Sequence, residues 1–217
     1  ARLHEMVNRI ARGLQEMGVT AGTRVGLFMP NCPQYVMCYY AILKAGGVVV
    51  NFNPLYSGHE IEHQLNDANV AVMITVNLHR TYDKLVPFIG TSPMKRIVVC
   101  NFGEAMPLAR RALFMAAKAK EIAHPPEDAV HVTLNALLAC EPLTFPAMVD
   151  ADSTVAVLQY TGGTTGVPKG AMLTHSNLYI NTLQCTQWMV GLEPGNEVML
   201  AVIPFFHVFA MTVAMNL

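Results

Sequence analysis

Residues 24–51, RVGLFMPNCPQYVMCYYAILKAGGVVVN, predict a strand–helix–strand unit. The apolar segment 24–29 ends at Pro30 and is typical of a buried strand. Residues 33–45 predict a mostly buried helix that is stopped by Gly46-Gly47, and 48–51 predict the next strand. Because two strands joined through a helix favour a parallel pair with a right-handed crossover, this stretch indicates an α/β fold.

The same alternation continues on both sides of this unit. Apolar residues at helical spacing predict a helix over 3–17, and Ser57 with Glu60 forms a capping box that opens another helix. The remaining expected elements are a helix at 176–188 and strands at 70–75, 96–100, 154–160, 171–173 and 198–203. We therefore predict layered, parallel-sheet βαβ subdomains with helices on both faces.

An irregular stretch separates two parts of the chain. Pro125-Pro126-Glu127-Asp128 predicts a loop, and the residues from there to Asp152 show no clear periodicity. Domain boundaries fall in such segments, so we expect a first α/β subdomain over residues 1–150 and the start of a second over 151–217. The chain begins inside a helical pattern and stops inside an apolar stretch, so we expect it to be part of a longer protein.

The composition is unusually apolar. Of 217 residues, 53% are hydrophobic and only 13% are charged, against about 25% charged in typical soluble domains. Such a chain has much surface to bury, in its own core, against a further part of the protein or in a homodimer. The net charge of −1 gives no reason to expect nucleic acid as a partner. The five cysteines are scattered, which is typical of reduced intracellular thiols and disfavours a zinc site.

Two segments bear on membranes. The apolar stretch 200–217 contains Pro204 and His207, whereas a spanning helix needs about 20 uninterrupted apolar residues, so we interpret it as buried core. Residues 104–123 predict an amphipathic helix whose basic side chains fit a membrane surface or, as we favour, an ordinary solvated face. These basic residues are Arg110, Arg111, Lys118 and Lys120.

The segment YTGGTTGVPKG, residues 160–170, carries the clearest chemical signal. It lies between two expected strands and contains four glycines, three threonines and one lysine. Glycines let backbone N–H groups approach an anion, threonine hydroxyls add donors, and lysine adds a positive charge. This composition predicts a loop that binds a polyphosphate.

Two common nucleotide motifs do not fit this segment. A Walker loop needs GxxxxGK followed by Ser or Thr, but Pro168 precedes Lys169 and Gly170 follows it, which disfavours a P-loop kinase. The GxGxxG fingerprint is absent, and the segment leads into a strand rather than directly into a helix. A plain hairpin turn is the structural alternative, which the length and polarity of the segment disfavour.

The segment resembles the phosphate-binding signature of the adenylate-forming superfamily, which includes acyl-CoA synthetases, peptide-synthetase adenylation domains and firefly-type luciferases. Gly163 stands where most members have serine, and this variant followed by PKGAMLTH looks most like bacterial long-chain fatty-acid–CoA ligases. Residues 46–56, 62–67 and 203–209 resemble the same ligases. The resemblance implies the large N-terminal α/β domain of these enzymes, truncated in this chain.

The resemblance also implies roles for individual residues. In the family the loop closes over the β- and γ-phosphates of ATP, with Mg²⁺ assisting, while an acyl carboxylate attacks the α-phosphorus; this calls for oriented donors and a cation. Lys169 is one implied catalytic residue. The other is His207, which helps to place the substrate carboxylate; from the residues alone a packed core histidine is favoured. The implied nucleotide-binding residues are Thr161, Gly162, Gly163, Thr164, Thr165, Gly166 and Lys169.

Other residues near these motifs receive weaker interpretations. We interpret His175 as part of the start of the following helix. The aromatic residues Trp188, Phe205, Phe206 and Phe209 fit either the lining of an acyl channel or ordinary core. No metal ligand is implied within the chain, because the family places its Mg²⁺-binding glutamate, its adenine contacts and a further catalytic lysine downstream.

The implied function is ATP-dependent activation of a long-chain fatty acid to an acyl-adenylate, followed by transfer to CoA. We expect the chain alone to be inactive, and the whole protein to be cytoplasmic, with peripheral contact to the inner membrane left open. Adenylation of an aryl or amino acid is one alternative. A non-catalytic nucleotide-binding domain is another.

Overall fold

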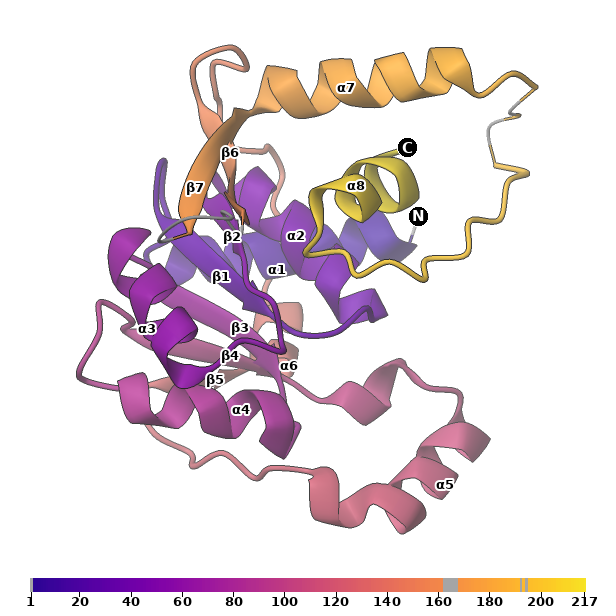
Figure 1. Ribbon diagram of the computed structural model, residues 1–217. Helices are drawn as coiled ribbons and strands as arrows, with labels where there is room; N and C mark the ends of the chain where they lie inside the picture. The colour runs from indigo at the N-terminus through magenta and orange to yellow at the C-terminus, as the bar shows by residue number, and fades with distance from the viewer. Residues whose placement is uncertain (1, 162–167, 192, 194) are drawn as a thin grey trace.

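A computed structural model of the chain describes residues 2–161, 168–191, 193 and 195–217 (Figure 1). Within them, a seven-stranded sheet has the order β5-β4-β3-β1-β2-β6-β7. Neighbouring strands are parallel, except that β7 is antiparallel to β6. The predicted α/β class is confirmed, with this one antiparallel strand added. The strands are β1 Arg24–Phe28, β2 Val48–Asn51, β3 Val72–Val76, β4 Arg96–Cys100, β5 His131–Thr133, β6 Val155–Thr161 and β7 Lys169–Thr174.

The first five strands have the doubly wound order 2-1-3-4-5. In such sheets the chain passes from β1 to β2 on one side and returns to β3 on the other, so the connections leave a crevice at the carboxyl ends of the strands. β6 joins this sheet beside β2 and places its own carboxyl end, which leads into the predicted phosphate loop, at the same edge. The sheet therefore positions Thr161, the last residue of β6, at the same edge as the ends of β1 and β2.

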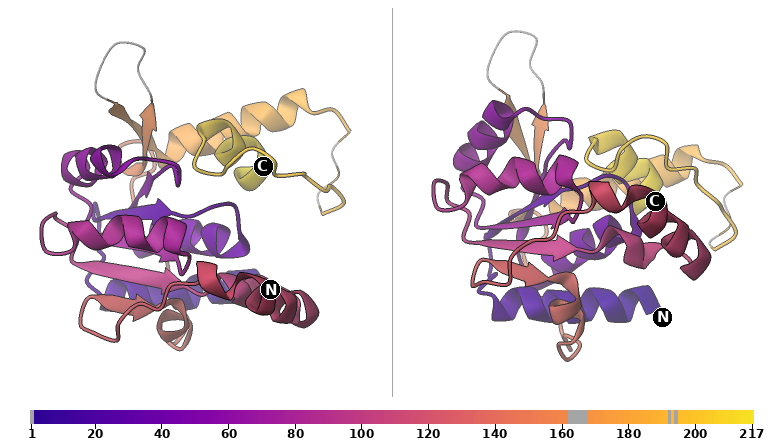
Figure 2. Two further views of the ribbon diagram at one scale, coloured as in Figure 1. Left: turned by 60° about the horizontal axis from the view of Figure 1, so that its bottom comes forward. Right: turned by 90° about the horizontal axis from the view of Figure 1, so that it is seen from below.

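Helices cover both faces of the sheet (Figure 2). One face packs against α1, α2 and α6, and the other against α3 and α4. The strands alternate between these two cores: Val25 and Leu27 face the first, whereas Phe28 faces the second. The helices of the two layers are α1 Arg2–Glu16, α2 Pro33–Ala45 and α6 Leu134–Leu138, and α3 Gly58–Asp67 and α4 His79–Leu85.

The boundaries of the predicted helices follow from local chemistry. Pro33 opens α2, where its missing N–H costs nothing, and Gly46 closes it with a φ of 92°. The capping box predicted for α3 is present, with Ser57 and Glu60 each satisfying the backbone N–H of the other. Helix α7, His175–Trp188, has a second capping box, formed by Thr174 and Asn177.

The prediction for the middle of the chain is partly wrong. The helix expected over 104–123 is shorter, α5 Leu108–Lys118, and lies between the 3₁₀ turns η2 Phe102–Ala105 and η3 Ala119–Glu121. No residue of α5 is buried, and Figure 1 shows this helix set away from the sheet. Such exposure agrees with a solvated helix, and a membrane contact stays a prediction.

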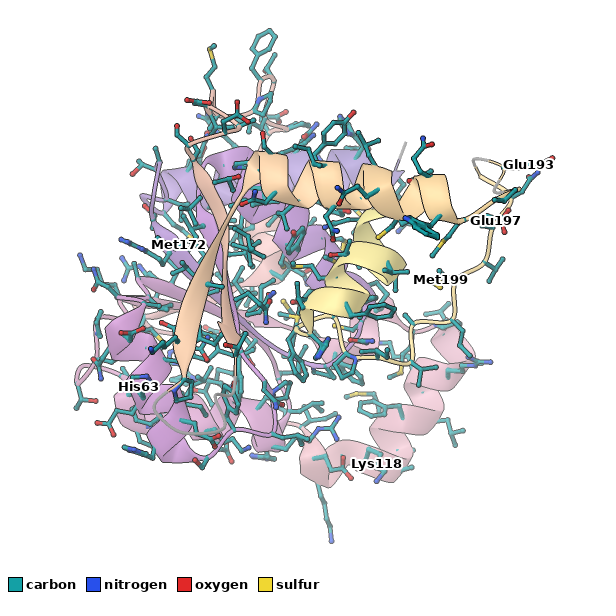
Figure 3. All side chains as sticks on the ribbon, turned by 45° about the horizontal axis from the view of Figure 1, so that its top comes forward. His63, Lys118, Met172, Glu193, Glu197 and Met199 are labelled. Atoms are coloured by element: carbon teal, nitrogen blue, oxygen red, sulfur yellow. The ribbon has the colours of Figure 1, made fainter. Side chains whose placement is uncertain are left out.

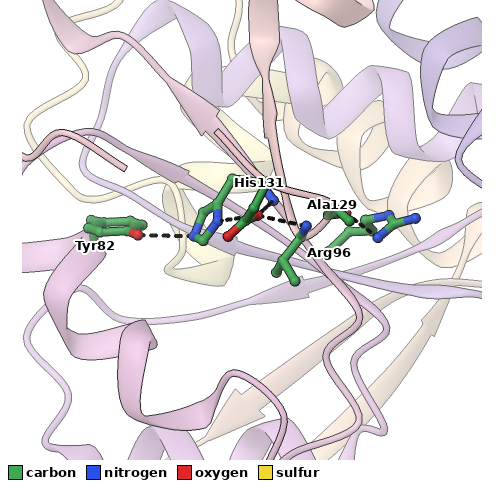
Figure 4. Close-up of polar contacts among 6 residues, drawn as sticks. Tyr82, Arg96, Ala129 and His131 are labelled. Atoms are coloured by element: carbon green, nitrogen blue, oxygen red, sulfur yellow. Dashed lines mark hydrogen bonds and ion pairs between the residues drawn. The ribbon is translucent and has the colours of Figure 1, made fainter. Parts of the chain in front are cut away.

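The stretch predicted to be irregular contains the edge strand β5 (Figure 4). Asp128 Oδ1 accepts hydrogen bonds from the backbone N–H groups of Val130 (2.8 Å) and His131 (2.9 Å) and from His131 Nδ1 (2.8 Å). His131 Nε2 lies 3.0 Å from the hydroxyl of Tyr82, and Arg96 donates to the carbonyl of Ala129. The strand is three residues long, too short for periodicity to reveal. Its pairing with β4 and the bond from Arg96 hold it at the edge of the sheet.

The strand predicted over 198–203 is also wrong. This segment has no strand partner, and the side chains of Val198, Leu200 and Val202 are 96%, 82% and 73% exposed. In the described part of the chain, no strand of the sheet pairs with this segment. Two short helical turns follow, α8 Val208–Ala210 and the π-helical η4 Met211–Asn216.

Three further findings bear on the sequence predictions. The division at residue 150 stays a prediction; β6 nevertheless hydrogen bonds to β2 within one sheet. All five cysteines are free thiols. Among the described residues, no helix is both long and apolar enough to cross a membrane.

Candidate functional site

The hairpin of β6 and β7 brings two of the predicted site residues opposite each other. Thr161 is the last residue of β6 and pairs with Lys169, the first residue of β7. Residues directly opposite in an antiparallel pair project from the same face, so the hydroxyl and the ammonium group lie on one side of the hairpin. Both residues are exposed. The other predicted nucleotide-binding residues lie outside the described residues: Gly162, Gly163, Thr164, Thr165 and Gly166.

The alternation along β6 decides which side of the hairpin this is. Tyr160 projects to the α3 side, and its ring lies so close to Gly170 that a Cβ there would be 3.0 Å from Tyr160 Cε2. Gln159 and Thr161 therefore project to the opposite face. Gln159 Nε2 donates to the carbonyl of Phe206 (3.0 Å). Thr161 and Lys169 thus share a face with the segment that carries His207.

His207 lies at the start of α8. The backbone N–H of Phe209 donates to its Nδ1 (3.3 Å), so in the neutral ring the proton is on Nε2. The residue is exposed. This leaves Nε2–H as a donor at the surface, which suits a carboxylate or phosphate oxygen. His207 is not a packed core residue, the interpretation that the residues alone favoured.

Two polar side chains fix the segment before His207. Asn31, which follows β1, accepts a hydrogen bond from the N–H of Phe205 through Oδ1 (2.7 Å). Its Nδ2 donates to the carbonyls of Ala201 (3.1 Å) and Ile203 (3.0 Å). On the other side, Gln159 holds the carbonyl of Phe206. The segment is thereby tied to the carboxyl ends of both β1 and β6.

A buried chain of hydrogen bonds supports Gln159. The hydroxyl of Tyr35 donates to Asn51 Oδ1 (2.6 Å), and Asn51 Nδ2 donates to Gln159 Oε1 (3.1 Å). Tyr35 is fully buried, and Asn51 is 3% exposed. Burial raises the pKa of Tyr35 well above its usual value, so the phenol stays a proton donor. Deprotonating or deleting any member would leave a buried polar group without its partner.

The described residues at this edge fit an anion rather than a metal. Lys169 supplies a positive charge, and Thr161 and His207 supply donors, a set that fits a polyphosphate and a carboxylate. Among the residues that the structure describes, no group of three or more His, Cys, Asp or Glu side chains forms a metal-binding cluster.

The four aromatic residues do not form one cluster. Phe205 is 8% exposed and packs on Tyr35 with ring centroids 5.6 Å apart, so it belongs to the core. Phe206 is half-buried. Trp188 and Phe209 are mostly exposed and line a cavity of about 470 Å³ between α7 and η4. A common acyl channel lined by all four is not present in this arrangement.

His175 starts α7, as expected, and follows the end of β7 that is opposite to Lys169. It lines a cavity of about 460 Å³ near the start of α1, and burial lowers its pKa. A further cavity, of about 670 Å³, opens at the carboxyl ends of β3, β4 and β5. Its amide and carboxylate groups are largely engaged with one another: Glu104 Oε1 accepts from Asn101 Nδ2 (3.3 Å) and Asn135 Nδ2 (3.1 Å).

The sequence analysis missed the residues that position the site. They are polar side chains outside the segment 160–170, and all but Gln159 are far from it in sequence: Asn31, Asn51, His63, Asp67 and Gln159. A signal for two of them was present, because Asn31 and Asn51 each stand at the carboxyl end of a predicted strand. His63 and Asp67 lie on α3, where His63 Nε2 is 3.3 Å from the carbonyl oxygen of Pro168 and Asp67 accepts a hydrogen bond from the hydroxyl of Tyr160. Nothing in the spacing of that helix indicates these contacts.

Comparison with known proteins gives a consistent result. A family profile described as AMP-binding enzyme matches residues 1–217. The chain is 40% identical over 214 residues to a long-chain-fatty-acid–CoA ligase of Bacillus subtilis, covering 96% of this chain and 37% of that protein. It is 37% identical over 222 residues to the ligase of the same name from Escherichia coli O157:H7, covering 98% and 38%. The chain thus spans well under half the length of these relatives.

Solved structures agree on the fold. A long-chain-fatty-acid-CoA ligase from Archaeoglobus fulgidus superposes with a TM-score of 0.78 at 27% identity, covering 99% of this chain and 37% of that one. An anthranilate CoA ligase in complex with anthranoyl-AMP gives a TM-score of 0.79 at 22% identity, covering 97% and 36%. The second likeness concerns the fold alone.

Proposed function

Because the chain belongs to the AMP-binding enzyme family, we propose that the protein carrying it activates a long-chain fatty acid with ATP and transfers the acyl group to CoA. The observation that carries the proposal is the shared face of Thr161, Lys169 and the His207 segment at the carboxyl edge of the sheet. The relatives named as long-chain-fatty-acid–CoA ligases support the choice of acid. A cytoplasmic location and peripheral membrane contact remain expectations from the sequence.

Each residue has a separate task in this proposal. Lys169 and Thr161, with the loop residues Gly162, Gly163, Thr164, Thr165 and Gly166, bind the β- and γ-phosphates of ATP. Lys169 offsets the charge that grows on the pyrophosphate leaving group, an electrostatic contribution of about 3–4 kcal/mol in comparable sites. His207 donates through Nε2–H to the fatty-acid carboxylate and orients it for attack on the α-phosphorus. Mg²⁺ assists phosphoryl transfer when bound, with ligands expected elsewhere in the longer protein.

The test is pyrophosphate release by the full-length protein with fatty, aryl and amino acids, with and without CoA. CoA-dependent turnover that is greatest on long fatty acids is the expected result. Turnover confined to aryl or amino acids would keep adenylation and reject the fatty acid. No turnover with any acid would favour a non-catalytic nucleotide-binding domain.

A pair of lysine variants tests the site itself. Lys169→Ala should lower kcat by about 100-fold or more, whereas Lys120→Ala, at an exposed position of η3, should leave it unchanged. Equal activity of Lys169→Ala and the wild type would reject the assignment of Lys169. We also propose that residues 1–217 alone form no acyl-CoA, since the relatives that they match are much longer; turnover by the isolated chain would disprove this.

A further inference from the structure

Helix α3 contacts both strands of the hairpin next to the predicted phosphate loop. His63 Nε2 lies 3.3 Å from the carbonyl oxygen of Pro168, and Asp67 Oδ2 accepts a hydrogen bond from the hydroxyl of Tyr160. Figure 3 shows His63 on this helix beside the hairpin. His63 and Asp67 are four residues apart and so lie on the same side of α3. One helix face therefore touches the two residues that directly precede Thr161 and Lys169.

The helix that makes these contacts is itself firmly held. Its capping box fixes the N-terminus, and Ile61 and Leu65 are fully buried in the core of that face. Gln64, which is 1% exposed, donates through Nε2 to the carbonyl of Asn51 at the end of β2 (2.9 Å). α3 thus joins the ends of β2, β6 and β7, and its position is set by packing rather than by the hairpin.

Tyr160 connects α3 to both strands of the hairpin, because it belongs to β6, bonds to Asp67 and packs on Gly170 of β7. Its side chain is 7% exposed and lies against Gly170, its partner across the strands, where even a methyl group would press on the ring. Burial raises the pKa of Tyr160 far above its usual value, with the carboxylate of Asp67 adding to the effect. The phenol therefore keeps its proton and donates it to Asp67. Because the Pro168 carbonyl accepts only, the neutral ring of His63 carries its proton on Nε2.

We propose that His63 and Asp67 are positioning residues that fix Lys169 and Thr161 for phosphate binding, an inference that rests on the proposed function. Thr161 and Lys169 are the terminal pair of the ladder and are exposed, so without anchors this pair would fray. A phosphate clamp needs its donors held to within about 0.5 Å. His63 fixes the peptide before Lys169, and Asp67 fixes the residue before Thr161.

The test compares variants of the full-length protein in ATP-dependent pyrophosphate release. His63→Ala and Asp67→Ala should each lower kcat/KM for ATP by about 10-fold to 100-fold, with KM for the fatty acid unchanged. Asp67→Asn retains an oxygen acceptor for Tyr160, and His63→Gln retains an Nε2 donor, so both should recover most of the loss. Glu62→Ala, an exposed neighbour on the same helix, is the matched control and should behave as wild type.

The outcomes separate this inference from the proposed function. If the wild type turns over fatty acid but the alanine variants match Glu62→Ala, the positioning role is rejected while the function stands. If the conservative variants fail to recover activity, the contacts are not the cause and the role is also rejected. If the wild type shows no turnover, amide hydrogen exchange of residues 155–161 and 169–174 decides: faster exchange in the alanine variants alone supports the anchoring, and equal exchange overturns it.

Discussion

Replacing Gln159 with leucine should detach the His207 segment while leaving the sheet intact. Gln159 is 8% exposed and makes two hydrogen bonds, from Asn51 Nδ2 (3.1 Å) and to the carbonyl of Phe206 (3.0 Å). Leucine has a similar volume but makes neither. A buried donor left without a partner costs about 1–3 kcal/mol, and the Phe206 carbonyl, which is only partly buried, regains water at a smaller cost. We therefore expect a loss of about 2 kcal/mol in the free energy of unfolding.

The same substitution should weaken acid binding. The segment before His207 would keep its hydrogen bonds to Asn31 and the packing of Phe205 on Tyr35, but the carbonyl directly before His207 would be released. A displacement of this kind should raise KM for the fatty acid about 10-fold or more, with KM for ATP unchanged. Steady-state kinetics of the full-length protein, with urea unfolding alongside, measure both quantities.

Tyr35→Phe is the matched control for this prediction. It removes the 2.6 Å hydrogen bond from Tyr35 to Asn51, at the other end of the series of hydrogen bonds that includes Gln159, and lowers the free energy of unfolding by about 1–2 kcal/mol. It leaves the bond between Gln159 and Phe206 in place, so KM for the acid should not change. If both variants raise KM equally, or if Gln159→Leu leaves it unchanged, the argument that Gln159 positions His207 is refuted.

Three further outcomes are expected. Gly13→Ala should lower the melting temperature, measured by circular dichroism, because its Cβ would lie 3.0 Å from the backbone of α6; overpacking of this kind costs about 1–3 kcal/mol. Hydrogen bonds from His131 lower the pKa of Asp128 in the folded protein below its usual value of 3.8. The ionised carboxylate therefore stabilises the fold at pH values above 3.8, and this stabilisation is lost as the pH falls through the lowered pKa. The urea midpoints of wild type and Asp128→Asn should accordingly differ at neutral pH and converge in acid. An aromatic disulfide should modify half-exposed Cys185 before Cys32, whose pKa burial raises to about 12.

The elements that were predicted correctly are those whose signals are local. The unit from β1 to β2 combines a proline at the start of α2, a glycine at its end and two apolar strands, all within 28 residues. The capping box of Ser57 and Glu60 involves residues three apart. Each signal acts on the backbone that carries it, so no knowledge of the tertiary structure is needed.

The wrong predictions concern segments whose state depends on a distant partner. Residues 198–203 are as apolar as a buried strand, yet they pair with no strand of the described sheet and their side chains are largely exposed. Conversely, β5 is short and polar and becomes a strand because β4 offers it an edge. Sequence periodicity reports how a segment would pack and contains no information on whether an edge is available.

The residues that position the site were hidden for the same reason. His63 and Pro168 are separated by 105 residues, and Asp67 and Tyr160 by 93. The glycine-rich segment could be recognised because its glycines, threonines and lysine are consecutive in the sequence. The residues that contact it from α3 are single polar side chains, and their pattern does not differ from that of an ordinary amphipathic helix. Only the sheet order, which places β6 beside β2, brings α3 to the loop.

One regularity in the sequence links the fold to the site. An asparagine stands at or just after the carboxyl end of each of the first four strands: Asn31, Asn51, Asn77 and Asn101. An asparagine side chain both donates and accepts, so it can hydrogen bond to the backbone of a segment that crosses the edge of a sheet.

The four asparagines differ in what they hold. Asn31 and Asn51 hold elements of the candidate site, whereas Asn77 accepts from the N–H of Phe102 (2.8 Å) and Asn101 accepts from the N–H of Gly103 (3.1 Å). The asparagines after β3 and β4 thus stabilise local turns, whereas those at the ends of β1 and β2 hold residues of the candidate site. The difference depends on which segment of the chain crosses the end of each strand. β6 lies next to β2, and the segment that carries His207 crosses the β1–β2 end of the sheet, where Asn31 donates to the carbonyl of Ala201 (3.1 Å) and Asn51 donates to the sulfur of Met211 (3.5 Å).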